Sequence, residues 1–186
     1  KNNQMTFTAP LQAFAYWEKN TPNQLMFNQP FLEGPVKMSY HEAGIEIRKM
    51  AQALINLDYT PKSKIALLSK NCSHWIMADL AIQMAGHISV PIYPTINADS
   101  VAQIMKHSES KAVIIGKLDN YDKQKSGLKD FIKIGIKAYQ IEETLSWEDM
   151  VENSEELEIL PEQKAEDLLT IMYTSGTTGS PKGVMH

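Results

Sequence analysis

Apolar and polar positions follow two different spacings along this chain. In the first third, apolar residues recur every three to four positions, which is typical of helices with one buried face. This spacing predicts a helix over residues 10–19, in which Leu11, Phe14 and Trp17 face the core. From residue 65 onward, short continuous apolar runs take over, and such runs are typical of strands covered on both faces.

The stretch between the first helix and these runs predicts a hairpin or an edge strand followed by a long helix. Turn residues surround a short apolar piece at residues 25–27 and lead to residues 36–40. Ser39 and Glu42 have the spacing of a capping box, in which each side chain binds the backbone N–H of the other residue. Apolar residues at helical spacing then continue the helix to about Asn56.

The remaining chain alternates strands with helices. Buried strands are predicted at residues 65–68, 87–92, 112–116, 136–141 and 168–173. Helices are predicted at residues 74–85, 100–107 and 121–134, with a further short helix starting at 146–149. Ser73 and Ser100 are the predicted N-caps of the first two of these helices. This alternation predicts an α/β fold with a doubly wound, mostly parallel sheet flanked by helices, in which ligands bind beyond the carboxyl ends of the strands.

Composition narrows the class of protein. Hydrophobic residues make up 43% and charged residues 22% of the chain, as in ordinary soluble domains. The net charge of -4 gives no sign of nucleic-acid binding. The single cysteine, Cys72, rules out an internal disulfide and fits a reducing compartment. With no apolar run long enough to cross a bilayer and no signal core, we expect a cytoplasmic protein.

Several titratable residues are weak candidates for chemistry. Four histidines lack metal-ligand spacing with one another and with the cysteine, so we expect surface or capping positions for His41, His74, His87 and His107. Cys72 stands at a helix start, but a lone cysteine without a nearby base is a weak nucleophile candidate. The acidic residues of 142–167 and the lysines of 121–134 are interpreted as solvated surface. No metal site is predicted.

The stretch of residues 173–183 is the strongest candidate for binding. It combines glycines, clustered hydroxyl side chains and one lysine directly after a buried strand. Glycines let backbone N–H groups point inward together, hydroxyls add donors, and lysine adds a mobile positive charge. These features predict binding of a polyphosphate, and a flexible surface turn is the simpler alternative. The predicted phosphate-binding residues are Thr174, Ser175, Gly176, Thr177, Thr178, Gly179 and Lys182.

Two better-known phosphate motifs do not fit this stretch. In the pattern G-x-x-x-x-G-K-[ST], a second glycine is required where Pro181 stands, and Lys182 is followed by Gly183. In G-x-G-x-x-G, a glycine is required two positions after Gly176, where Thr178 stands. The stretch therefore belongs to neither of these two phosphate-binding motifs.

Residues 167–185 resemble, without gaps, the signature loop of the AMP-forming, or adenylate-forming, synthetase superfamily, which includes acyl-CoA synthetases, luciferases and peptide-synthetase adenylation domains. Residues 71–95 are similar to a segment of long-chain fatty acyl-CoA synthetases that ends in Val-Pro-Ile-Tyr-Pro-Thr. The resemblance extends from about Phe7 onward. Asp58 and Ser63 depart from the family pattern of glycine and aspartate, so we expect that turn to differ.

The resemblance implies a two-step ligase. A fatty carboxylate attacks the α-phosphorus of ATP, and the CoA thiol then displaces AMP from the acyl-adenylate. The resemblance assigns the loop to the β- and γ-phosphates of ATP, together with Mg²⁺, and makes CoA the co-substrate. The adenine pocket, the magnesium-binding residue, the acyl tunnel and the catalytic lysine would all follow this loop in the parent protein.

We therefore expect residues 1–186 to be part of an N-terminal AMP-binding domain, with an N-terminal helix and edge strands in residues 1–40 and the phosphate loop at its C-terminal end. This piece would contain no catalytic residue and would be inactive without the rest of the parent chain. Fatty acid, ATP and CoA are the expected partners, with peripheral membrane contact of the parent as a further expectation. Another adenylating enzyme and a non-catalytic nucleotide-binding scaffold stay open as alternatives.

Overall fold

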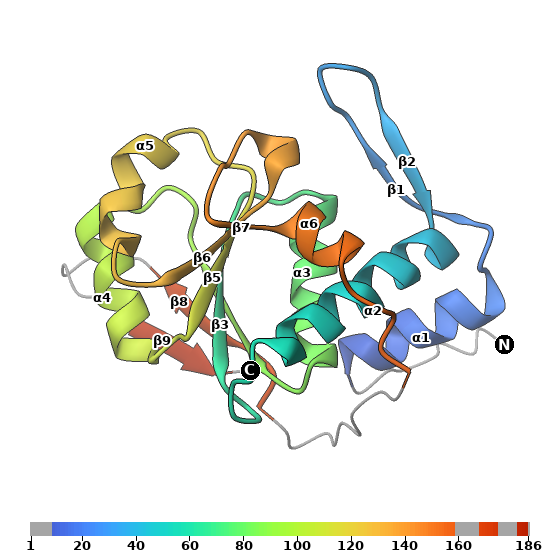
Figure 1. Ribbon diagram of the computed structural model, residues 1–186, viewed down its shortest axis with the longest axis horizontal. Helices are drawn as coiled ribbons and strands as arrows, with labels where there is room; N and C mark the ends of the chain where they lie inside the picture. Colours follow the sequence, from blue (N-terminus) through green and yellow to red (C-terminus); the bar gives the residue numbers. More distant parts are fainter. Residues whose placement is uncertain (1–8, 159–167, 175–181, 186) are drawn as a thin grey trace, which may run out of the picture.

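Figure 1 shows the computed structural model, which describes residues 9–158, 168–174 and 182–185. The strands are β1 (Leu25–Gln29), β2 (Val36–Ser39), β3 (Lys64–Leu68), β4 (Ile88–Ile92), β5 (Ala112–Ile115), β6 (Ile132–Gly135), β7 (Leu145–Ser146), β8 (Ile171–Thr174) and β9 (Lys182–Met185). The helices are α1 (Pro10–Asn20), α2 (Tyr40–Asn56), α3 (Ser73–Met84), α4 (Ala98–Ser108), α5 (Tyr121–Gln124) and α6 (Trp147–Glu152), with 3-10 turns η1 (Lys125–Leu128) and η2 (Lys137–Tyr139).

In the described part of the chain, the large sheet has seven strands in the order β7-β6-β5-β3-β4-β8-β9. Its neighbouring strands run parallel, except that β9 is antiparallel to β8. Helices α1, α2, α3 and α6 lie on one side of the sheet, and α4 and α5 lie on the other (Figure 1). The predicted α/β fold, a mostly parallel sheet covered by helices on both faces, is confirmed.

The continuous apolar runs have a direct structural cause. Successive side chains of a strand point to opposite faces, so a strand covered on both faces needs apolar residues at every position. In β3, Ile65 and Leu67 pack into one core cluster while Ala66 and Leu68 pack into the other, and all four are fully buried. Strand β5 divides its side chains between the two clusters in the same way.

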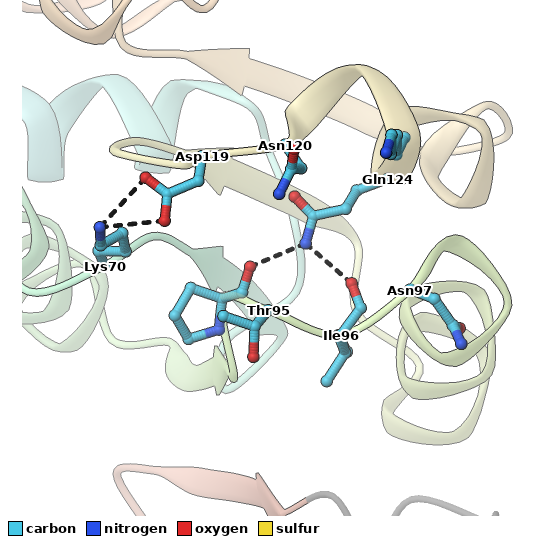
Figure 2. Close-up of a pocket in the computed structure, with 9 residues that line it drawn as sticks. Lys70, Thr95, Ile96, Asn97, Asp119, Asn120 and Gln124 are labelled. Carbon is cyan, nitrogen blue, oxygen red and sulfur yellow. Dashed lines mark hydrogen bonds and ion pairs between the residues drawn. The ribbon is translucent and has the colours of Figure 1, made fainter.

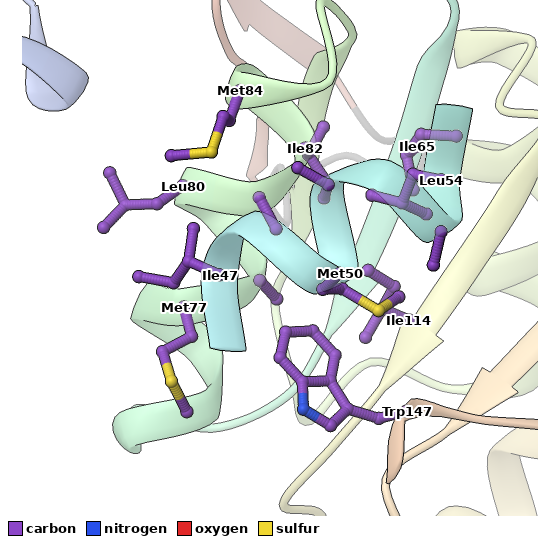
Figure 3. Close-up of a cluster of buried hydrophobic side chains, with 14 of the residues drawn as sticks. Ile47, Met50, Leu54, Ile65, Met77, Leu80, Ile82, Met84, Ile114 and Trp147 are labelled. Carbon is purple, nitrogen blue, oxygen red and sulfur yellow. The ribbon is translucent and has the colours of Figure 1, made fainter. Parts of the chain in front are cut away.

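The larger cluster fills the space between the sheet and the helices α1, α2, α3 and α6. At its centre, Trp147 is completely buried near Met50 and Ile114 (Figure 3). The first helix contributes Leu11 and Phe14, as predicted, but Trp17 is 40% exposed. That part of the prediction was wrong: Trp17 instead meets the neighbouring ring of Tyr16 edge to face.

Helix caps agree with the sequence at two sites and differ at two others. Ser39 and Glu42 form the predicted capping box, with bonds of 3.1 and 3.0 Å, and Ser146 caps α6. The predicted caps Ser73 and Ser100 are wrong. Asn97 caps α4 by accepting from the Ser100 N–H, because its side-chain carbonyl stands three residues earlier.

At the start of α3, Cys72 occupies the N-cap position and makes no side-chain cap bond. The orphan N–H of Ser73 donates instead to Oε1 of Gln29, at 2.9 Å. Gln29 belongs to the β1–β2 hairpin, which projects from the body beyond α1 and α2 (Figure 1). A residue distant in sequence thus replaces the local cap, and it fixes the hairpin on the start of α3.

The helix predicted over residues 121–134 is confirmed only for residues 121–128, as α5 and η1, and the strand predicted over 136–141 is wrong. The chain turns through α5 and η1, and the strand lies earlier, at β6. Within η1, Gly127 lies close against α4, where a Cβ would lie 2.2 Å from the backbone oxygen of Ala98. The ammonium of Lys133 then binds the carbonyls of Leu128 and Phe131, so a lysine of the supposed helix face closes the turn.

Replacing Gly127 by alanine tests this close approach. The added methyl must push η1 away from α4, and overpacking of this kind costs about 1–3 kcal/mol of unfolding free energy. Urea unfolding measures the loss, with the exposed neighbour substitution Ser126→Ala as the matched control. A Gly127→Ala variant as stable as the control would show that the approach is not tight.

Candidate binding site at the carboxyl edge of the sheet

The predicted phosphate-binding stretch begins and ends in a hairpin at the edge of the large sheet. Thr174 of β8 pairs with Lys182 of β9, so two of the predicted binding residues lie directly opposite each other. Strand β9 was not predicted, because its four residues are too few to show a period. Lys182 therefore belongs to a strand rather than to the loop. The other predicted residues lie outside the described residues: Ser175, Gly176, Thr177, Thr178 and Gly179.

The hairpin ends at the same edge of the sheet as the loops of its parallel neighbours. Tyr173 pairs with Ile92 at the end of β4, and Pro94 follows two residues later. Pro94 lines a pocket of about 210 Å³ that is built from the segments after β3, β4 and β5. The lining residues are Lys70, Pro94, Thr95, Ile96, Asn97, Asp119, Asn120, Lys123 and Gln124.

The chain path explains why a pocket forms here. After β3 the chain passes to α3 on one face of the sheet, whereas after β5 it passes to α5 on the other face. Because β3 and β5 are neighbours, their outgoing loops diverge and leave a crevice between them. The predicted rule that ligands bind beyond the carboxyl strand ends therefore points to this pocket as well as to the hairpin.

Charges in the pocket favour an anion. Lys70 donates to both carboxylate oxygens of Asp119, at 3.1 Å each, and the pair crosses the ends of β3 and β5 (Figure 2). Lys123 adds a second ammonium, which takes part in none of the ion pairs among the described residues. Two ammonium groups and one carboxylate leave the pocket with a positive balance.

The side chain of Gln124 lines the pocket and is held in place by two hydrogen bonds. Its side chain is only 4% exposed, and its Nε2 donates to the carbonyls of Pro94 and Ile96 at 2.8 Å each (Figure 2). The same amide leaves Oε1 buried without a hydrogen-bond partner in the described part of the chain. Because an unpaired buried acceptor is costly, Oε1 of Gln124 favours an anionic ligand that carries a hydrogen-bond donor as well.

Sequence reasoning missed the pocket. Its charged and amide residues belong to three loops that are far apart in the chain, and none of them forms a recognisable motif. One signal was available: Lys70, Asn97 and Asp119 each follow a predicted strand within five residues. Polar residues after neighbouring parallel strands meet at one edge, but the order of the strands has to be known first.

The histidines divide into two groups. His41 and His107 are exposed, as predicted, whereas His87 is only 4% exposed and His74 is half-buried, so the surface prediction was wrong for these two. Nδ1 of His74 lies 2.9 Å from the hydroxyl of Tyr139, and burial lowers the pKa of His74 to about 4. Cys72 Sγ lies 3.7 Å from the hydroxyl of Ser69.

The sequence of this chain is similar to those of known enzymes. The sequence pattern of the AMP-binding enzyme family matches residues 14–186. This chain belongs to the AMP-binding enzyme family. Its curated relatives include long chain acyl-CoA synthetases 4 and 2 of Arabidopsis thaliana, which are 29% and 30% identical over 90% and 95% of this chain. The chain spans only 28% and 30% of the length of these two proteins.

Solved structures agree on the fold of this AMP-binding family member. An anthranilate CoA ligase in complex with anthranoyl-AMP superposes with a TM-score of 0.77 over 94% of this chain and 34% of that chain, at 20% identity. A benzoate CoA ligase from Burkholderia xenovorans gives a TM-score of 0.75 over 98% and 34%, at 19% identity. At this identity the likeness shows the fold alone.

Two further properties concern the described residues only. They contain no cluster of three histidine, cysteine, aspartate or glutamate side chains that would hold a metal ion. None of the described helices has the length and apolar character to cross a membrane.

The His74 environment predicts a loss of stability in mild acid. The folded-state pKa lies below the ordinary value of 6.5, so the unfolded chain takes up this proton first as the pH falls. The unfolding free energy should therefore fall between pH 6.5 and 4, by about 3 kcal/mol from this group. Urea titrations at several pH values measure the slope. His74→Gln should flatten it and the exposed control His41→Gln should not; equal slopes in both variants would contradict the assignment.

Proposed function

We propose that this chain forms the ATP-phosphate-binding part of an acyl-CoA synthetase that activates a long-chain fatty acid as its adenylate and transfers it to CoA. Membership of the AMP-binding enzyme family supports the adenylation step. The names of the relatives support the acyl class, because both Arabidopsis proteins are long chain acyl-CoA synthetases. Neither the acid nor the transfer to CoA follows from the fold alone.

The observation that carries this proposal is the pairing of Thr174 with Lys182 at the carboxyl edge of the sheet. The pairing holds the two ends of the predicted phosphate loop side by side next to β4. In the proposed reaction the carboxylate oxygen forms a bond to the α-phosphorus, and the bond to the departing pyrophosphate breaks. Negative charge grows on that pyrophosphate, where positioned donors and a lysine ammonium stabilise it most.

The pocket at the ends of β3, β4 and β5 then has a role in the same reaction. Acyl-CoA synthesis uses two phosphate-bearing substrates, and the hairpin is assigned to ATP. CoA carries phosphates together with hydroxyl and amine donors, which matches the positive balance of the pocket and the unpartnered Oε1 of Gln124. We assign the nucleotide part of CoA to this pocket.

The alternatives are distinguished by their reactions. A peptide-synthetase adenylation domain would exchange pyrophosphate into ATP with an amino acid rather than a fatty acid. A non-catalytic scaffold would bind ATP and show no exchange with any acid. The chain alone should form no acyl-CoA, because it spans less than a third of its relatives.

Lys182→Ala tests the role of the hairpin. In the full-length protein, loss of the ammonium should lower fatty-acid-dependent ATP–pyrophosphate exchange by about 10²–10³-fold, as for the loss of one transition-state donor. The exposed lysine of the other hairpin gives a matched control, Lys37→Ala, which should keep full exchange. Equal exchange by the two variants would contradict the proposal.

Lys123→Ala tests the pocket separately. Removing this exposed ammonium should raise the KM for CoA in thioester formation by about three- to fivefold, the range of one exposed ion pair. Pyrophosphate exchange needs no CoA and should be unchanged. Lys129→Ala, in the same segment but outside the pocket, is the control. A changed KM for ATP with an unchanged KM for CoA would exclude the assignment.

A further inference from the structure

Tyr173 connects the phosphate-binding hairpin to helix α4. Its hydroxyl shares a hydrogen bond of 2.6 Å with Nδ1 of His107, in the last turn of α4. The two rings also meet edge to face, with centroids 5.8 Å apart. Tyr173 itself is 5% exposed and packs in the core cluster beneath α4. The contact joins an exposed helix position to the residue immediately before Thr174.

Strand β8 needs support of this kind because its pairing with β4 is sparse. The register contains Ile92 opposite Tyr173 and one isolated bridge between Ser89 and Thr170. The N–H of Ser89 donates to Leu169 on the β8 side, so the nitrogen of residue 91 points to the same side. Residue 91 is proline and has no hydrogen to donate, which removes one bond from the β4–β8 ladder.

On its other side β8 pairs, among the described residues, with the edge strand β9 alone. The described part of the hairpin that carries Thr174 and Lys182 is therefore attached to the body by few backbone bonds, by the side chain of Tyr173 and by Ile171, which packs against the same core cluster. A hydrogen bond at the far end of that side chain sets how deeply the ring sits and where the strand lies. Phosphate binding depends on such placement, since errors near 1 Å are costly in catalysis.

We propose that His107 is a positioning residue for ATP, which holds Tyr173 and through it the Thr174–Lys182 pair. This inference rests on the proposed function of the hairpin in phosphate binding. His107 would touch neither ATP nor the acid. Its removal should weaken ATP binding specifically, whereas a purely structural contact would lower stability and leave the affinity of the folded enzyme unchanged.

The test uses the full-length protein and four variants. His107→Leu and Tyr173→Phe each remove the hydrogen bond, and each should raise the KM for ATP in pyrophosphate exchange by about three- to tenfold, the range of one hydrogen bond. The double variant should be no worse than either single one, because both lose the same contact. His107→Asn places an amide near Nδ1 and should restore most of the affinity. The KM for the fatty acid should not change.

Controls separate this inference from the proposed function. His41→Leu removes another exposed histidine and should leave the KM for ATP unchanged. Direct ATP binding by calorimetry is measured on the same proteins, because it needs no reaction. If the wild type binds ATP but shows no exchange with any acid, the proposed function fails while the variants still report on His107. An unchanged ATP affinity in both single variants, or additive losses in the double one, would overturn the inference, as would a wild type that binds no ATP.

Discussion

The whole structure depends on covering a sheet whose central strands β3, β4 and β5 are buried on both faces. Residues 65–68 of β3 are apolar on both faces of the sheet, so helices must cover both faces. Parallel neighbours also need long connections, and the connecting helices supply that cover. Covering both faces sends the loops after β3 and β5 to opposite sides of the sheet, and the crevice between these two strands results from this requirement.

Local signals predicted much of this fold. The capping box at Ser39 and Glu42 lies within four consecutive residues. The continuous apolar runs of β3 and β5 are enough to predict that both faces of these strands are buried. Two of the errors arose where a distant residue contacts the local segment. Gly127 of η1 lies close against Ala98 of α4, and the N–H of Ser73 donates to Gln29 of the hairpin. No window of sequence contains both members of either pair.

The candidate site divides in the same way. The hairpin stretch could be found from sequence because its glycines, hydroxyls and lysine are consecutive, although strand β9 was missed. The pocket could not, because its members meet only after the strands are ordered as β5-β3-β4. The bond between His107 and Tyr173 also depends on tertiary packing, since α4 must first lie over β8.

Helix α4 reaches from one candidate site to the other. Its N-cap Asn97 lines the pocket, and His107 in its last turn contacts Tyr173 beside the hairpin. An α-helix of this length is about 16 Å long and nearly rigid, so its two ends cannot be placed independently. Ligands that each fix the position of α4 would favour one another's binding. Linkage requires that the factor be identical in both directions, whichever ligand arrives first.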